Sequence, residues 1–132
     1  MRTDSPAKVW AVTFAVAIFP LLGFWLYGLF DLDEGFYAAV SWEMMQRGEW
    51  ITPYYNGNPW FEKPILLYWF AIPSISAFGE EVGPRLPAVL ATVSLYGVCG
   101  IFLARCVSLT AGRLCVLILG SCLLLVGVGR MM

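Results

Sequence analysis

The 132-residue sequence contains no histidine, and only 13% of its residues are charged. Without imidazole the chain cannot build a Ser-His-Asp or Cys-His nucleophile, an HExxH metal site or a histidine-ligated haem. Eight basic residues against nine acidic ones give a net charge of -1, so there is no basic field to hold nucleic acid. Any catalysis must therefore use carboxylates, lysine, arginine, tyrosine or a thiol, and nucleic acid is excluded as a partner.

The four cysteines lack a metal-binding or redox spacing. They are Cys99, Cys106, Cys115 and Cys122, and none belongs to a CxxC pair. The two seven-residue spacings put each pair on one helix face, but about 10 Å apart, which is too far for a disulfide within one helix. We therefore interpret the cysteines as small buried packing residues.

Hydrophobic residues, by contrast, make up 60% of the chain. They form four runs without a charge, at residues 9–30, 64–79, 86–104 and 114–129. A charge in hydrocarbon costs several kcal/mol, and an apolar helix of about 20 residues crosses the roughly 30 Å core of a bilayer. The pattern predicts an all-α integral membrane protein.

The first run is predicted to be an uncleaved anchor. It is longer than the apolar region of a signal peptide and ends without a small-x-small cleavage site. Because Arg2 and Lys8 precede it, the positive-inside rule places the N-terminus in the cytoplasm.

The second run is predicted to stay at the outer surface of the membrane. If residues 64–79 crossed the bilayer, Arg105 and Arg113 would lie on the outer side, against the positive-inside rule. The run is also short and contains Pro73. The expected layout has three transmembrane helices, at residues 9–30, 84–104 and 114–129. One outer segment, at residues 31–83, lies between the first two.

The outer segment is rich in tryptophan and tyrosine, which gather at the headgroup level of membranes. Residues 34–47 are typical of an amphipathic interfacial helix, with Asp33 as N-cap and Gly48 as C-cap. Its apolar face, carried by Phe36, Val40 and Met44, is expected to lie on the membrane. Further on, Asn56-Gly57 is a strong turn signal for a small hairpin.

The charges of this segment admit two interpretations. In the first, Asp33 and Glu34 are the solvated end of a span, and Lys63 extends to lipid headgroups. In the second, a carboxylate and a cation converge at the outer leaflet on an anionic lipid-linked substrate, with Lys63 on a phosphate and Asp33 at the reacting centre. Spacing alone leaves both open.

Four strings resemble a known family: DEGFY at 33–37, MMQRGEWITP at 44–53, FEKPILLYW at 61–69 and PRLP at 84–87. In this order they are similar to the N-terminal part of polyprenyl-phosphate-dependent membrane glycosyltransferases of the GT-C class. This family includes the aminoarabinose transferases of lipid A and the protein O-mannosyltransferases. The resemblance extends over nearly the whole chain.

The resemblance implies a role for five residues of the outer segment. Asp33 would be the catalytic acid, which orients or deprotonates the acceptor or helps to hold a divalent metal. Lys63 would contact the donor's phosphate, while Glu34, Tyr37 and Glu62 would support substrate binding. Because a lipid phosphate is already a good leaving group, positioning, a base and charge neutralisation are what the enzyme must supply.

The resemblance also implies a location and partners. The chain would be a multi-pass protein of the bacterial inner membrane, with its loop in the periplasm. It would take a sugar from a polyprenyl-phosphate donor to lipid A or a protein. Family members are several-fold longer and carry a second acidic motif after the third span, so residues 1–132 are expected to be an N-terminal fragment that is inactive alone.

Two rival functions are not enzymatic. A small membrane anchor or partner-binding subunit would retain the loop without its activity. A transport component is the weaker rival, because no charge lies inside a predicted span to mark an ion path.

Overall fold

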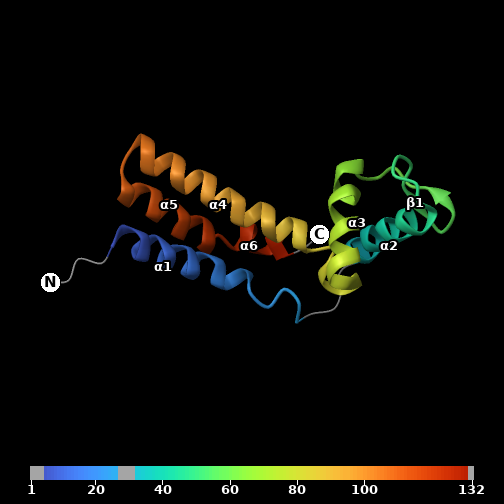
Figure 1. Ribbon diagram of the computed structural model, residues 1–132, viewed down its shortest axis with the longest axis horizontal. Helices are drawn as coiled ribbons and strands as arrows, with labels where there is room; N and C mark the ends of the chain where they lie inside the picture. Colours follow the sequence, from blue (N-terminus) through green and yellow to red (C-terminus); the bar gives the residue numbers. More distant parts are fainter. Residues whose placement is uncertain (1–4, 27–31, 131–132) are drawn as a thin grey trace. The chain divides into compact units, whose positions relative to one another are not determined.

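The computed structural model describes residues 5–26 and 32–130, with the side chains of residues 32 and 33 left aside. These residues form helices and one hairpin, which fall into two compact units (Figure 1). The first unit comprises α1 (Pro6–Ile18), the 3-10 turn η1 (Phe19–Leu21), most of α4 (Leu86–Cys106), α5 (Leu109–Ser121) and α6 (Leu123–Arg130). The second comprises α2 (Leu32–Arg47), β1 (Tyr54–Tyr55), β2 (Asn58–Pro59) and α3 (Ile65–Val82).

Two of the described helices, α3 and α4, are long and apolar enough to cross a membrane. A third candidate is the pair α5 and α6, whose axes bend by 64° at Cys122. A mostly helical chain with two or three candidate spans is what an all-α membrane protein requires.

The first apolar helix is shorter than the predicted span at residues 9–30. Helix α1 passes into η1 and ends at Leu21, and Leu22 is already extended with φ -64° and ψ 152°. Pro20 lies in η1, where its ring removes a backbone donor and stops the helix from continuing. Residues 27–30 of the predicted span lie outside the described chain.

The predicted surface segment 64–79 corresponds to α3. This helix extends to Val82, includes Pro73, and is kinked at Gly79, where φ is 83°. By length and composition it qualifies as a span. Its placement along the membrane surface therefore stays a prediction.

In the first unit the helices approach closely through small residues. A Cβ on Gly112 of α5 would lie 2.4 Å from the carbonyl oxygen of Gly100 in α4, and one on Gly120 would lie 2.6 Å from Cα of Ala17 in α1. The buried core consists of Ala17, Leu21, Tyr96 and Val116. The cysteines are free, and the interpretation of them as uniformly buried is wrong, because Cys106 is exposed and the other three are half-buried.

In the second unit the predicted helix at residues 34–47 is confirmed as α2. The assignment of Asp33 as its N-cap is wrong, because the helix already begins at Leu32. An acidic residue in the first turn is favourable all the same, since it faces the positive end of the helix dipole. Gly48 is confirmed as the C-terminal stop, with φ 66° and backbone bonds from Gly48 to Met45 and from Glu49 to Met44.

The apolar face of α2 packs against protein, which differs from the expectation that it lies on the membrane. Tyr37, Val40 and Met44 form a buried cluster with Tyr68 and Ile72 of α3. Burying this face against a neighbouring helix satisfies the same amphipathic pattern that a membrane surface would satisfy.

The predicted hairpin at Asn56-Gly57 is confirmed. Strands β1 and β2 pair antiparallel, with Tyr55 opposite Asn58. Asn56 and Gly57 both have positive φ, 51° and 80°, as a two-residue type I′ turn requires. The turn is tied to α2, because the Gly57 N–H donates to Oε1 of Glu43 at 3.0 Å.

Two glycines of the second unit offer a matched test of backbone conformation. Alanine at Gly48 meets no atom within 4 Å but must adopt a φ of +66°, so Gly48→Ala is expected to lower the free energy of unfolding by about 1–2 kcal/mol. Gly35→Ala, also without a near contact but inside α2, is expected to raise it by about 0.5–1 kcal/mol. Thermal unfolding in detergent, followed by circular dichroism, measures both; an equal effect of the two would contradict the assigned C-cap.

Candidate functional site

Two of the residues implied by the sequence, Tyr37 and Lys63, come together in the second unit. The Lys63 Nζ lies over the Tyr37 ring, 5.1 Å from its centroid. Tyr37 is anchored in the core with 5% of its surface exposed, whereas Lys63 is exposed. The contact is a cation–π interaction that holds the ammonium group at the protein surface.

Asp33 lies in the first turn of α2, one helical turn before Tyr37. Its side chain is outside the described part of the structure. The periodicity of the helix places position 33 on the same face as position 37. The catalytic role of Asp33 stays a prediction. Its backbone lies one helical turn before Tyr37, the residue that contacts Lys63.

Glu34 is held by a residue to which the sequence analysis gave no role, Arg85. Nη2 of Arg85 lies 2.5 Å from Oε2 of Glu34, and its Nε donates to both carboxylate oxygens at 3.2 Å. Both side chains are 4% exposed, so this is a buried, bidentate ion pair. Nη1 of Arg85 also donates to the carbonyl oxygen of Phe24 at 2.9 Å. One guanidinium thus joins three segments of the second unit.

A sequence signal for Arg85 did exist. The residue stands alone between Pro84 and the apolar run that starts at Leu86, where an unpaired charge would be costly. A single arginine at that place requires a carboxylate partner, but the sequence does not say which one.

The hairpin and the start of α3 position the loop that carries Lys63. Phe36 of α2 stacks on Trp60 at a centroid distance of 5.8 Å and meets Tyr55 edge-on at 4.9 Å. The backbone N–H of Trp60 donates to the carbonyl oxygen of Pro53 at 2.8 Å. This aromatic cluster fixes the chain three residues before Lys63.

A second, exposed anchor holds the hairpin to the end of α2. Oε1 of Glu43 accepts from Arg47, whose Nη2 lies 2.7 Å away, as well as from the Gly57 N–H. The Arg47 guanidinium in turn lies over the Tyr54 ring at 4.4 Å.

Glu62 and Tyr68 complete the surroundings of Lys63. Glu62 is the neighbouring residue in the chain and is exposed. Tyr68 is completely buried, and its hydroxyl has no hydrogen-bond partner among the described residues.

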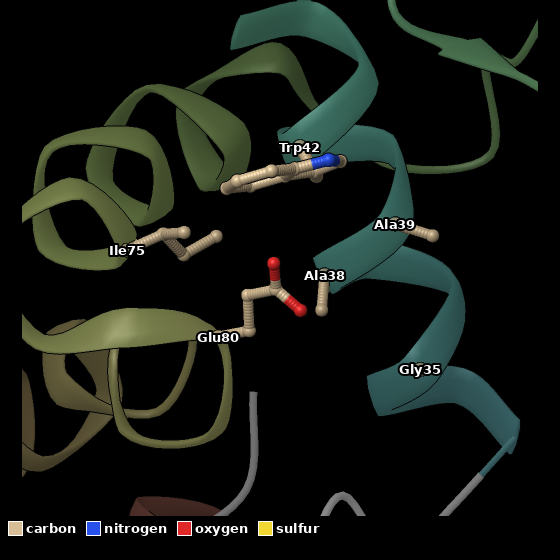
Figure 2. A pocket seen from close by; sticks show the side chains of 6 residues that line it. All are labelled: Gly35, Ala38, Ala39, Trp42, Ile75 and Glu80. Carbon is tan, nitrogen blue, oxygen red and sulfur yellow. The ribbon is translucent and has the colours of Figure 1, made fainter. Parts of the chain in front are cut away.

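A separate cavity of about 260 Å³ lies between α2 and α3. Figure 2 shows the Trp42 ring along one side of it and the Glu80 carboxylate pointing into it, while its remaining walls are small or apolar side chains. The α2 residues of this cavity are offset by two positions, about 200° around the helix, from those that contact α3 at Tyr68. The cavity therefore does not belong to the Lys63–Tyr37 contact.

In the described chain no three histidine, cysteine or acidic residues gather in a way that could hold a metal ion. Because the Asp33 side chain is not among the described groups, the divalent metal implied for it stays a prediction. The arrangement that is described, the ammonium group of an exposed lysine over the ring of Tyr37 in the second turn of α2, is suited to binding an anionic group.

Comparison with known proteins finds relatives over part of the chain. It is 36% identical over 94 residues to an undecaprenyl phosphate-alpha-4-amino-4-deoxy-L-arabinose arabinosyl transferase of Pseudomonas fluorescens, covering 68% of this chain and 16% of that protein. An enzyme of the same name from Pseudomonas aeruginosa is 34% identical over 90 residues, covering 67% and 16%. An uncharacterized protein of Aquifex aeolicus is 41% identical over 86 residues, covering 60% and 20%.

The chain thus spans about a sixth of the length of the named transferases that it matches. No family profile matches the sequence, and no solved structure matches it. These relatives support a relation to GT-C-like glycosyltransferases, in agreement with the resemblance found in the sequence.

Breaking the buried ion pair is expected to destabilise the second unit. Arg85→Met leaves the Glu34 carboxylate buried without its partner and is expected to lower the free energy of unfolding by about 3–5 kcal/mol. Adding Glu34→Leu removes the unpaired charge and is expected to restore most of the loss. Denaturant unfolding in detergent measures both variants.

The exposed ion pair provides the matched control. Arg47→Met breaks the ion pair with Glu43, in which the Arg47 side chain is 42% exposed and that of Glu43 is 22% exposed. It is expected to lower the free energy of unfolding by less than about 1 kcal/mol. A loss in Arg85→Met no larger than that in Arg47→Met would contradict the clamp assigned to Arg85.

Proposed function

We propose that this chain forms the donor-binding part of a membrane glycosyltransferase that moves a sugar from a polyprenyl phosphate to an envelope acceptor, lipid A or protein. The observation that carries the proposal is the position of the Lys63 ammonium over Tyr37, next to the first turn of α2 where Asp33 lies. The printed names of the relatives, which specify undecaprenyl phosphate and an aminoarabinose, support this class of donor.

In this proposal Lys63 binds the phosphate of the donor. Lys63 is exposed, so a ligand can reach it, and its ammonium group lies over the Tyr37 ring. The stacking of Trp60 on Phe36 fixes the chain three residues before it. A charge-assisted hydrogen bond to phosphate neutralises the charge that develops as the sugar leaves. Glu62, beside Lys63, supports the same site.

Asp33 acts on the acceptor in this scheme. Its carboxylate takes the proton of the acceptor hydroxyl while the acceptor oxygen bonds to the anomeric carbon and the bond from that carbon to the phosphate oxygen breaks, with inversion. The lipid phosphate leaves with the bonding electron pair. Glu34, the next residue, is fixed by Arg85 and so holds the first turn of α2 in place.

The site is proposed to lie at the outer face of the bacterial inner membrane, with α3 along the surface. Helix α2 packs on α3 and carries Glu43 and Arg47. If α3 crossed the bilayer, these charges would be drawn toward hydrocarbon, which costs several kcal/mol for each charge. A surface position keeps them in water, and the N-terminus stays cytoplasmic.

The donor site can be tested by lipid binding. The chain is reconstituted in phosphatidylcholine vesicles and titrated with undecaprenyl phosphate, and its intrinsic tryptophan fluorescence is recorded. Lys63→Ala is expected to weaken binding about 10- to 100-fold, because one charge-assisted hydrogen bond is lost. Lys63→Arg is expected to retain much of the affinity, since it keeps the cation.

Two controls accompany this titration. Lys8→Ala removes a lysine at the start of α1 and is expected to bind like the unchanged chain. Uncharged undecaprenol is expected to bind weakly to every variant. Equal binding of undecaprenol and undecaprenyl phosphate, or an unchanged affinity in Lys63→Ala, would refute the donor site.

The role of Asp33 separates binding from chemistry. Asp33→Asn is expected to leave undecaprenyl phosphate affinity unchanged and to lower sugar transfer by about 10²–10⁴-fold, as loss of a general base does. Transfer is measured in native membranes that carry the substitution in the gene. Glu81→Gln, at an exposed acid of α3, serves as the control and is expected to be silent. Full transfer activity in Asp33→Asn would remove Asp33 from the mechanism.

A further inference from the structure

Tyr68 carries a buried hydrogen-bond donor that the second unit does not use. The side chain is 0% exposed, and its hydroxyl has no partner among the described residues. A buried hydroxyl without a hydrogen bond lowers stability, and native proteins keep few of them. Phenylalanine would fill the same space without this penalty, so a tyrosine at this position is suited to a ligand that accepts a hydrogen bond.

The position of Tyr68 indicates where such a partner would come from. The residue lies in the first turns of α3, five residues after Lys63, and shares a buried cluster with Tyr37. Tyr37 in turn carries the Lys63 ammonium group over its ring. The unused hydroxyl therefore belongs to the surroundings of the proposed donor site.

A second unused donor lies in the same cluster. Nε1 of Trp60 is buried without a partner in the described chain, and the Trp60 ring packs on the cluster that contains Tyr68. Indole and ammonium nitrogens can only donate hydrogen bonds, and a phenol donates readily. The ligand that suits such a set of groups is anionic and rich in acceptor oxygens, as a phosphate is.

We propose that the Tyr68 hydroxyl donates a hydrogen bond to the phosphate of the lipid-linked donor, beside the Lys63 ammonium group. This assignment rests on the proposed function and adds a binding residue to it. Glu62, the acidic residue beside Lys63 in the chain, is exposed, so its carboxylate can turn toward water when the phosphate binds.

Tyr96 in the first unit is a matched comparison. It too is 0% exposed with a hydroxyl that lacks a partner among the described residues. Its buried cluster consists of Ala17, Leu21 and Val116 and belongs to the first unit, whereas the Tyr37 ring that carries the Lys63 ammonium group belongs to the second. Removing the Tyr96 hydroxyl therefore changes the same kind of atom in a place where no anionic ligand is expected.

The test is a titration of the chain in phosphatidylcholine vesicles with undecaprenyl phosphate. Tyr68→Phe is expected to weaken binding about tenfold, which corresponds to one hydrogen bond to a charged group, and to leave the melting temperature unchanged or higher. Tyr96→Phe is expected to bind like the unchanged chain. Unchanged binding in Tyr68→Phe, or an equal loss in the two variants, would overturn the assignment.

The outcome distinguishes this inference from the proposed function. A loss of binding in Lys63→Ala with full binding in Tyr68→Phe would keep the donor site and remove Tyr68 from it. Full binding in both variants would refute both. A second measurement needs no substitution: the ring ¹³Cζ resonance of labelled Tyr68 is expected to shift with undecaprenyl phosphate and to stay in place with undecaprenol. The absence of that shift at saturation would also overturn the assignment.

Discussion

The buried pair of Arg85 and Glu34 is the interaction on which the second unit depends. Its partners are 51 residues apart in the chain, and the same guanidinium reaches the Phe24 carbonyl oxygen, 61 residues away. Burying two charges is unfavourable unless their geometry is good and their remaining donors are used. Here the two-oxygen contact and the bond to the carbonyl meet that condition, so the start of α2 is held in one position relative to the end of α3. Asp33, the residue before Glu34, thereby gains a defined backbone position.

Some residues of α2 stabilise the second unit, and others position Lys63. Val40 and Met44 bury their side chains against α3, while Tyr37 on the same face also supports the Lys63 ammonium group. At the other end of the helix, Glu43 and Arg47 hold the hairpin, and the hairpin's aromatic residues fix the loop that leads to Lys63. Helix α2 thus positions Lys63 in two ways, directly through the Tyr37 ring and indirectly through the hairpin.

Local features of this unit could be predicted from the sequence, whereas long-range ones could not. Asn56-Gly57 and Gly48 were identifiable because each demands a positive φ that few other residues adopt. The apolar face of α2 was identifiable, but its partner was not, because a helix and a membrane surface satisfy the same periodicity. The pairing of Arg85 with Glu34 was hidden because charge complementarity does not specify distance along the chain. Nor could Tyr68 be singled out, since its place in an apolar run gives no hint that its hydroxyl lacks a partner.

The first unit is assembled from the two ends of the described chain, and this arrangement affects the order of biogenesis. Helix α1 packs against α5, yet nearly ninety residues separate them, and the whole second unit is made in between. At a synthesis rate of about 5–20 residues per second, α1 waits for its partner on the order of ten seconds. During that interval α1 has no α5 to pack against. Beyond Lys8 its surface is mostly apolar, with Val12, Val16 and, in η1, Phe19 exposed, which suits a segment that meets acyl chains before it meets protein.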